Sequence, residues 1–195
     1  MSFRIEKKYQ FALAKLTNFY EFLSENSAKQ LYPRRLIKSI YFDNQTFSSY
    51  NDSIEGVLPR KKIRIRNYPN MNKKFNLEIK INSIEGRFKT VEKNINHNDF
   101  LKKGYFDSEY DLCFPVLEIN YLREYISVFN LRITLDTSIS YKKFNDKRSI
   151  PLMESAIVEV KSNNLENFNY IEDKIHFPTT RFSKYCNAID ELNII

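Results

Sequence analysis

The clearest pattern in the chain is an alternation of charged and apolar residues in several short segments. In one of them, Lys62, Arg64 and Arg66 alternate with Ile63 and Ile65. Because successive side chains of a β-strand point to opposite faces, the three cations share one face at a spacing of roughly 7 Å. Like charges in line repel one another, so this strand is expected to lie along a polyanion.

The same alternation, together with turn residues, predicts strands over residues 3–11, 37–43, 61–68, 74–83, 87–94, 116–128, 131–141 and 154–162. Helical spacing predicts helices over residues 13–31, 164–175 and 182–192, and a short helical connector over residues 97–109. Residues 44–59 are predicted to be a turn and tether. No repeat and no linker rich in Pro, Gly or Ser interrupts the chain, so we predict a single domain over residues 1–195.

Most of these strands have one charged face and one strongly apolar face. A solvated outer surface would explain any single strand of this kind. The recurrence of the pattern favours a closed antiparallel barrel, which has no exposed edges, with charged faces inward and apolar faces covered by helices. The predicted fold class is therefore α+β: an antiparallel β-barrel with helices packed on its outside.

Composition narrows the class of ligand. The chain has 31 Lys and Arg against 24 Asp and Glu, a formal net charge of +7, which favours an anionic partner. Only three glycines occur in 195 residues, which argues against a glycine-rich phosphate loop. The aromatic residues lie mainly on apolar faces, so a stacking platform for nucleic acid is not expected.

The predicted inward-facing side chains are mostly basic. They are Lys8, Lys62, Arg64, Arg66, Lys80, Arg123, Arg132, Lys161 and Lys184, with the carboxylates Glu6, Glu78, Asp136 and Glu159. A triphosphate or a longer phosphate chain would complement this surplus, because guanidinium groups bind phosphate oxygens in a bidentate manner. The carboxylates suit a hard divalent cation that bridges those oxygens.

Other residue types indicate little further chemistry. Cys113 and Cys186 lack metal-ligand spacing and are expected to be reduced thiols of a cytoplasmic protein, and a disulfide between them is less favoured. His97 and His176 have no zinc-like partners. No apolar run is long enough to span a bilayer and no signal peptide is visible, so a soluble protein is expected.

Several motifs resemble those of the triphosphate tunnel metalloenzymes, the CYTH-like superfamily. They are Glu-x-Lys near residue 6, Lys-x-Arg-x-Arg from residue 62, Glu-x-Lys at residues 78 and 159, and a terminal Ser-Lys-Tyr. The segments 39–43, 64–66, 131–137 and 182–185 more narrowly resemble the polyphosphate polymerase branch, the VTC (vacuolar transporter chaperone) domain. The resemblance covers nearly the whole chain, from about Phe3 to about Leu192.

This resemblance implies a barrel whose interior binds a nucleoside triphosphate or polyphosphate. The implied phosphate-binding residues are Lys8, Lys62, Arg64, Arg66, Lys80, Arg123, Arg132, Lys161, Ser183 and Lys184, with Arg181 as a more distant basic candidate. Of these, Arg64, Arg66, Lys80, Arg132 and Lys184 are expected to act in catalysis. Glu159 is the leading metal ligand for Mn²⁺ or Mg²⁺, and Glu6 and Glu78 either hold the metal through water or orient neighbouring lysines.

One part of the chain departs from the polymerase pattern. Asn51, Asp52 and Ser53 stand where that branch often has another inward basic residue, and either Arg60 or Lys61 is a candidate to replace it. Two residues have plainer interpretations. Tyr41 is more typical of a core residue than of a ligand, and Asp136 is more typical of a partner for Arg132 than of a metal ligand.

The leading functional hypothesis is transfer of the γ-phosphate of ATP onto a growing polyphosphate chain. No protein nucleophile is needed, because positioning and charge neutralisation supply the catalysis. The alternatives are a hydrolase of tripolyphosphate or nucleoside triphosphate in the same tunnel, a weaker adenylate cyclase reading, a non-catalytic polyphosphate sensor and a nucleic-acid-binding barrel. ATP and polyphosphate are the expected partners, and nucleic acid is not expected to bind. The sequence leaves open whether a membrane protein at the inner face of the membrane is a partner. It also leaves the oligomeric state open.

Overall fold

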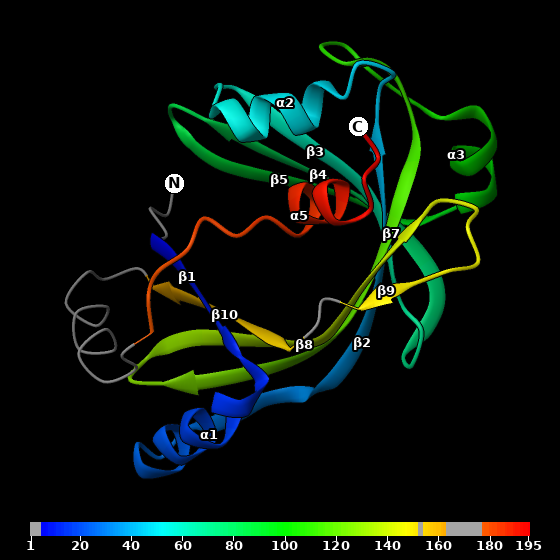
Figure 1. Ribbon diagram of the computed structural model, residues 1–195. Coiled ribbons are helices and arrows are strands. Elements are labelled where there is room, and N and C mark those ends of the chain that lie inside the picture. Colours follow the sequence, from blue (N-terminus) through cyan, green and yellow to red (C-terminus); the bar gives the residue numbers. More distant parts are fainter. Residues whose placement is uncertain (1–4, 152–153, 163–176) are drawn as a thin grey trace. The chain divides into compact units, whose positions relative to one another are not determined.

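A computed structural model describes residues 5–151, 154–162 and 177–195 of the chain (Figure 1). Its strands are β1 (Ile5–Ala12), β2 (Lys29–Asp43), β3 (Arg60–Tyr68), β4 (Asn72–Ser83), β5 (Gly86–Ile95), β6 (Tyr105–Asp107), β7 (Asp111–Val128), β8 (Leu131–Lys143), β9 (Ile150–Pro151) and β10 (Ser155–Ser162). Its helices are the 3-10 helix η1 (Leu13–Lys15), α1 (Leu16–Glu25), α2 (Ser48–Glu55), α3 (His97–Lys103) and α5 (Lys184–Glu191).

The ten strands form one sheet with the order β1-β10-β8-β7-β2-β3-β4-β5, and β6 and β9 pair with β7 and β8. The pairings of known register are all antiparallel. Within the described residues no pairing joins β1 to β5, so hydrogen bonding leaves these two as end strands. The antiparallel sheet with helices on its apolar faces confirms the predicted α+β class.

The chain divides into two compact units. Unit 1 comprises Met1–Arg35, Tyr121–Ile139 and Leu152–Phe182. Unit 2 comprises Leu36–Asn120, Ser140–Pro151 and Ser183–Ile195. The strands β2, β7 and β8 each contribute residues to both units. Whether the whole chain acts as the single predicted domain stays a prediction.

In unit 1 the apolar face of β1, β10 and β8 is covered by α1. Phe19 and Leu23 of this helix pack on a buried cluster that includes Tyr9, Ile133 and Val158. Leu16, Phe19 and Leu23 recur at helical spacing, which places them on one side of α1. Burial of these side chains against the sheet is what holds the short helix in place, because isolated helices of this length are marginal in water.

In unit 2 the apolar face of β2, β3 and β4 is covered by α3 and the strand pair β6-β7. Ile63 and Ile65, both without exposed surface, lie in a cluster with Phe42, Leu77 and Cys113. Phe100 and Leu101 of α3 pack against the same cluster. The isoleucines of the alternating segment therefore point into a core, and its three cations point to the opposite face. This arrangement confirms the two-faced strand that the sequence predicts.

Each of the eight predicted strands is present, several with longer bounds, and β6 and β9 were not predicted. The helix predicted over residues 13–31 is too long, because α1 ends at Glu25 and β2 already begins at Lys29. Ser27, with a φ of 52°, adopts a left-handed conformation that breaks the helix. The helix predicted over residues 182–192 is confirmed by α5. Residues 164–175 and His176 lie outside the described residues.

Two further expectations about elements need correction. The tether over residues 44–59 contains the helix α2. The connector over residues 97–109 is helical only to Lys103, and β6 follows. Gly104 separates them with a φ of 80°, and a Cβ there would lie 2.7 Å from the Cys113 carbonyl oxygen, so only glycine fits.

Candidate functional site

The polar face of β3, β4 and β5 carries a row of three lysines. Lys62 of β3 lies opposite Lys80 of β4, which lies opposite Lys89 of β5. Neighbouring strands are about 4.8 Å apart, and like charges placed directly opposite destabilise a sheet. The row therefore indicates a surface built for an anion. The sequence prediction included Lys62 and Lys80 but missed Lys89.

Two arginines of β3 flank this row around a single carboxylate, Glu78. Arg64 donates to Glu78 Oε2 through Nε at 2.9 Å and Nη2 at 2.7 Å, and Lys89 donates to Oε1 at 2.7 Å. Arg66 Nη1 lies 3.5 Å from the same Oε2 and Arg66 Nε donates to Ser39. Burial opposes ionisation of Glu78, but the two guanidinium groups and Lys89 outweigh it and lower its pKa to about 2. Glu78 thus stays charged and fixes three cations.

The pKa of Tyr41, on β2, reflects the positive electrostatic potential that these cations create. Arg64 Nη1 donates to its hydroxyl oxygen at 2.7 Å. Burial would raise the pKa of Tyr41, but the charges of Arg64, Arg66 and Lys62 overcome it and lower the pKa to about 8. A buried phenol that ionises more readily than in water lies in a strongly positive field. The polar face of unit 2 is therefore electrostatically prepared for an anion.

Helix α5 brings two more predicted residues to this region. Its N-cap, Ser183, accepts a hydrogen bond from Cys186 N at 3.3 Å and another from Lys62 Nζ at 2.7 Å. Lys184, half-buried, is the first residue of the helix. A helix N-terminus carries partial positive charge, so this end of α5 adds to the attraction for anions.

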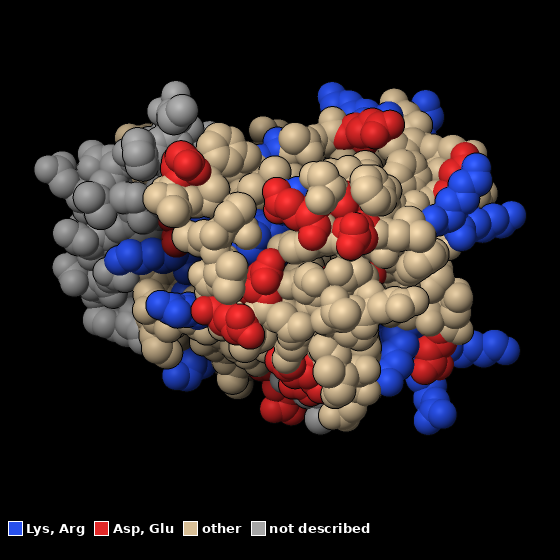
Figure 2. Space-filling view, turned by 90° about the horizontal axis from the view of Figure 1, so that it is seen from above, with Lys and Arg blue, Asp and Glu red and all other residues tan. Residues whose placement is uncertain are grey.

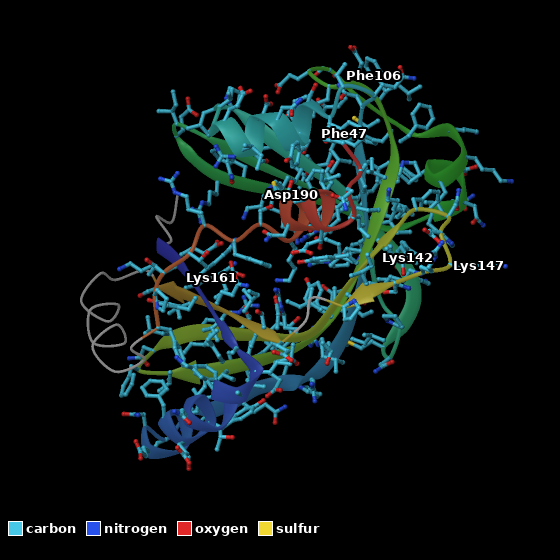
Figure 3. All side chains as sticks on the ribbon, viewed as in Figure 1. Phe47, Phe106, Lys142, Lys147, Lys161 and Asp190 are labelled. Carbon is cyan, nitrogen blue, oxygen red and sulfur yellow. The ribbon has the colours of Figure 1, made fainter. Side chains whose placement is uncertain are left out.

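Unit 1 has its own cluster of charged side chains, on the polar face of β1 and β10. Cross-strand pairing places Glu6 opposite Lys161 and Lys8 opposite Glu159, so opposite charges alternate. Lys161 Nζ lies 3.0 Å from Glu159 Oε1 and 3.6 Å from Glu6 Oε2. Lys8 Nζ donates to the Phe182 carbonyl oxygen at 2.8 Å. Lys161 is labelled in Figure 3.

The two glutamates of this cluster are close partners. Their side chains are 9% and 13% exposed, and Glu159 accepts a side-chain hydrogen bond from Glu6, so the pair shares one proton. Burial would raise the pKa of Glu159, but this hydrogen bond and the charges of Lys161, Arg123 and Lys8 hold it well below its usual range. Glu159 is therefore an anionic oxygen donor in a basic setting.

These carboxylates fit a divalent cation such as the one that the sequence resemblance implies. Magnesium is usually held by one or two carboxylates together with water and substrate phosphates. Glu6 and Glu159 would supply such a pair once a bound cation displaced the proton between them. Within the part of the chain that the structure describes, no group of three or more His, Cys, Asp or Glu forms a complete protein cage. Glu78 fits a metal less well, since basic side chains engage both of its oxygens, and the orienting role predicted for it suits the geometry better.

Arg123 and Arg132 occupy different environments. Arg123 binds Asp136 through two hydrogen bonds, Nε to Oδ1 at 2.6 Å and Nη2 to Oδ2 at 2.7 Å. The predicted pairing of Asp136 with Arg132 is wrong, because the chain register brings Arg123 of β7 to Asp136 of β8. Arg132 is exposed, lies opposite Lys161 on β10, and places its guanidinium carbon 5.8 Å from the ring centre of Tyr125.

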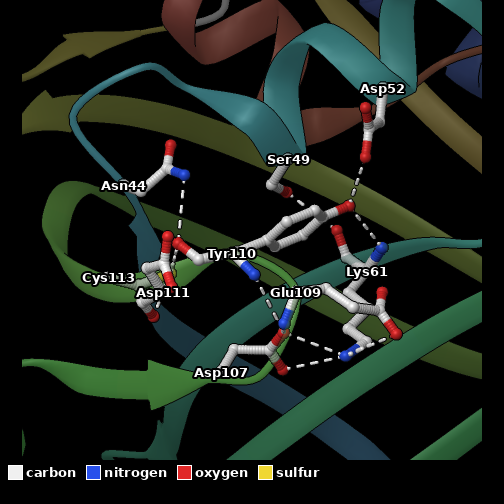
Figure 4. Close-up of polar contacts among 9 residues, drawn as sticks. All are labelled: Asn44, Ser49, Asp52, Lys61, Asp107, Glu109, Tyr110, Asp111 and Cys113. Carbon is white, nitrogen blue, oxygen red and sulfur yellow. Dashed lines mark hydrogen bonds and ion pairs between the residues drawn. The ribbon is translucent and has the colours of Figure 1, made fainter.

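Lys61 belongs to a separate network on unit 2 (Figure 4). Its ammonium group donates to Asp107 at 2.9 Å and lies 3.2 Å from Glu109. The Tyr110 hydroxyl accepts from Lys61 N at 2.9 Å and donates to Asp52 at 2.6 Å. Lys61 therefore forms hydrogen bonds and ion pairs that anchor the start of β3. Of the two candidates for the missing basic residue, this leaves Arg60.

The remaining expectations can be placed briefly. Cys113 and Cys186 are free and buried, as predicted. His97 stacks on Phe75 with ring centres 4.3 Å apart and has no metal-ligand partners among the described residues. Arg181 is exposed. On the face seen in Figure 2, acidic and basic side chains are interspersed. None of the described helices is long and apolar enough to cross a bilayer.

Comparison with known proteins places this geometry in a family. A search of curated proteins found no match. Among solved structures, a candidate adenylate cyclase from Bacillus halodurans is 15% identical, covers 98% of each chain and has a TM-score of 0.61. A candidate adenylate cyclase from Vibrio parahaemolyticus is 11% identical, covers 97% of this chain and 98% of its own, and has a TM-score of 0.60.

A third structure, a candidate adenylyl cyclase from Hippeastrum described as having a dominant triphosphatase activity, is 14% identical, covers 96% of each chain and has a TM-score of 0.56. At these identities the likeness shows a shared fold. The family model of the VTC domain matches residues 3–193, almost the whole sequence. The chain therefore belongs to the VTC domain family.

Proposed function

We propose that this protein is a polyphosphate polymerase that transfers the γ-phosphate of ATP to the end of a polyphosphate chain. The observation that carries the proposal is the lysine row across β3, β4 and β5, flanked by Arg64 and Arg66. These five cations share a face with Glu78, and three of them, Lys62, Arg64 and Arg66, place Tyr41 in a strongly positive field. Such a surface suits a chain of linked phosphates better than a single anion.

In the proposed reaction a terminal phosphate oxygen of polyphosphate attacks the γ-phosphorus of ATP. A new P–O–P bond forms, the bond between the γ-phosphorus and the β–γ bridging oxygen breaks, and ADP leaves with that oxygen. Arg64 and Arg66 neutralise charge on the transferred group, and Lys62, Lys80 and Lys89 align the phosphate chain. A protein nucleophile is not required.

The charged cluster of unit 1 is the candidate metal site of this proposal. Glu159 and Glu6 would hold Mn²⁺ or Mg²⁺, which when bound neutralises phosphate charge. Lys161 and Lys8 keep the carboxylates oriented, and Arg123, fixed by Asp136, and exposed Arg132 add phosphate-binding capacity. Ser183 and Lys184 at the start of α5 complete the set of proposed phosphate ligands.

A triphosphatase is the second candidate, favoured by the activity described for the Hippeastrum neighbour. The same side chains would serve, with water in place of polyphosphate as the acceptor. The ADP and orthophosphate released would then account for all of the ATP consumed. Substrate and acceptor preference, not the set of residues, separates the two proposals.

Product analysis decides between them. The purified chain is incubated with ATP, Mn²⁺ or Mg²⁺, and a short polyphosphate primer, and products are resolved by gel electrophoresis and orthophosphate assay. A ladder of lengthening polyphosphate is expected. Formation of orthophosphate alone would show that the protein is a triphosphatase and not a polymerase.

A matched variant tests the metal role. Glu159→Gln is expected to abolish turnover with either metal while the protein still binds tripolyphosphate, because the basic residues remain. Glu55→Gln, an exposed substitution on α2, serves as the control. Wild-type protein that binds tripolyphosphate and turns nothing over would instead identify a non-catalytic binding protein.

A further inference from the structure

Tyr41 is buried, as expected of a core residue, but it lies on the face of β2 opposite to that of Ile40 and Phe42. It is directly opposite Arg64 in the β2-β3 pairing, and Ser39 lies two residues before it, opposite Arg66. The Arg64 guanidinium carbon is 5.6 Å from the centre of its ring, and the side chain is almost fully buried. The interpretation of Tyr41 as a plain core residue therefore misses its hydroxyl.

A second aromatic ring restrains the position of that hydroxyl. Tyr185 of α5 stacks on Tyr41 with ring centres 5.2 Å apart and an interplanar angle of 15°. The Tyr185 hydroxyl donates to Asp43 Oδ2 at 2.6 Å, which holds the stacking partner in place. Two anchored rings leave Tyr41 Oη little freedom to move away from Arg64.

The hydrogen bonding of this phenol leaves a donor available for a ligand. Its oxygen accepts from Arg64 Nη1 at 2.7 Å, so its own proton is directed to another acceptor. The charged and titratable groups around it are Lys62, Arg64 and Arg66 of β3, Tyr185 of α5 and Tyr141 of β8, with Glu78 beyond Arg64 and Asp43 beyond Tyr185. Both carboxylates already accept hydrogen bonds, Glu78 from Arg64 and Asp43 from Tyr185, so an incoming phosphate oxygen is the acceptor that this setting favours.

We propose that the Tyr41 hydroxyl is a phosphate ligand of this site and that its ionised form competes with the phosphate chain for Arg64. The inference rests on the proposed function, since it assumes that Arg64 and Arg66 hold phosphates. Once deprotonated, the phenolate accepts from Arg64 as a charged partner and carries no proton to donate. A bound polyanion in turn disfavours the phenolate, so binding and protonation are coupled.

The consequence is that tripolyphosphate affinity falls above pH 8 because a tyrosine, and not a lysine, loses its proton. The cationic neighbours lower the pKa of Tyr41 to about 8, against the opposing effect of burial. Below pH 8 the phenol is protonated and the ligand binds fully. Above it, binding requires uptake of a proton, so affinity for tripolyphosphate falls by up to about tenfold per pH unit.

Two measurements test this on the intact chain. Tyrosinate absorbance is titrated from pH 6.5 to 10 with and without saturating tripolyphosphate, and the dissociation constant of tripolyphosphate is measured over the same range. Tyr41→Phe keeps the stacked ring and removes only the hydroxyl. Tyr50→Phe is the matched control, because the Tyr50 hydroxyl donates to Asp190 and its pKa is raised to about 12.

One tyrosine is expected to ionise near pH 8 in the wild type and in Tyr50→Phe, and to be missing in Tyr41→Phe. Tripolyphosphate should move that transition to higher pH, and the steep loss of affinity above pH 8 should disappear in Tyr41→Phe. Binding that leaves the transition unmoved would overturn the role of Tyr41 and spare the proposed function. A wild type that does not bind tripolyphosphate at any pH would overturn both.

Discussion

At the scale of single residues, Glu78 shows how one carboxylate organises several basic side chains. Its two oxygens contact Arg64, Arg66 and Lys89, which come from β3 and β5. Without it, guanidinium and ammonium groups at these distances would repel one another and turn outward. Glu78 therefore keeps the basic side chains in a compact array before any substrate arrives.

This arrangement predicts an acid-sensitive contribution to stability. The pKa of Glu78 is lowered to about 2 in the folded protein, so between pH 4.5 and 2 the unfolded state binds the additional proton. Stability is then fully present above pH 4.5 and is lost as pH falls, by up to about 3 kcal/mol. Urea unfolding of wild type and Glu78→Gln should differ most above pH 5 and converge towards pH 2.

Glu55→Gln, an exposed change, should leave the pH profile of unfolding unaltered. A gap between wild type and Glu78→Gln that stays constant from pH 5 to pH 2 would contradict the ionic role of Glu78.

A second prediction separates charge from geometry at Arg64. Arg64→Ala is expected to lower turnover about 10²- to 10³-fold, the usual cost of removing a group that stabilises transition-state charge. Arg64→Lys should restore only part of this loss, because an ammonium group cannot bind Glu78 and Tyr41 in the same fork. Steady-state kinetics measure the turnover of each variant, and Arg148→Ala, at an exposed position, is the control. Equal activity of Arg64→Ala and wild type would show that Arg64 does not belong to the site.

The residue types of the site could be predicted from the sequence, but several partners could not. Strand alternation identifies the common face of Lys62, Arg64 and Arg66, since that depends only on backbone geometry. Lys89 was missed, although the short turn between Ser83 and Gly86 fixes the register that places it opposite Lys80. The Arg123–Asp136 pair depends on the register between β7 and β8, which alternation within a single strand does not fix.

At the scale of elements, helix α2 is capped at its N-terminus by a residue that lies outside the helix. Asp43, the last residue of β2, accepts hydrogen bonds from Ser49 N at 3.0 Å and Tyr50 N at 3.1 Å. Phe47 adopts a left-handed conformation just before the helix. The segment has little apolar periodicity, so the sequence pattern predicts a tether; the cap that makes it helical comes from a neighbouring strand.

The same carboxylate ties α5 to α2, which predicts a large effect of a small substitution. Asp43→Ala removes the cap of α2 and the partner of Tyr185, so the free energy of unfolding should fall by about 2 kcal/mol or more. Tyr185→Phe should lose only the part of this free energy that comes from the hydrogen bond between Tyr185 and Asp43. Urea unfolding at neutral pH measures both, with Asp146→Ala, an exposed loop carboxylate, as the control. A change below about 0.5 kcal/mol for Asp43→Ala would contradict the proposed double role.

At the scale of the whole molecule, three strands pass through both compact units. Since β2, β7 and β8 contribute hydrogen-bonded residues to each unit, we expect unfolding to be one cooperative transition. Ile133→Ala in unit 1 and Ile63→Ala in unit 2 should each lower the same transition, by about 2–5 kcal/mol, because both side chains are fully buried. Far-ultraviolet circular dichroism and tyrosine fluorescence should coincide; separate transitions for the two variants would show that the units unfold independently.

The lysine row has one more consequence, for the resting protein. Ammonium groups fixed side by side attract small anions from the solution, so chloride or sulfate from the buffer will accumulate there before substrate binds. Phosphate-chain binding is then an ion exchange, driven partly by the entropy of the released salt. Apparent affinities will accordingly depend on the identity and concentration of the background electrolyte.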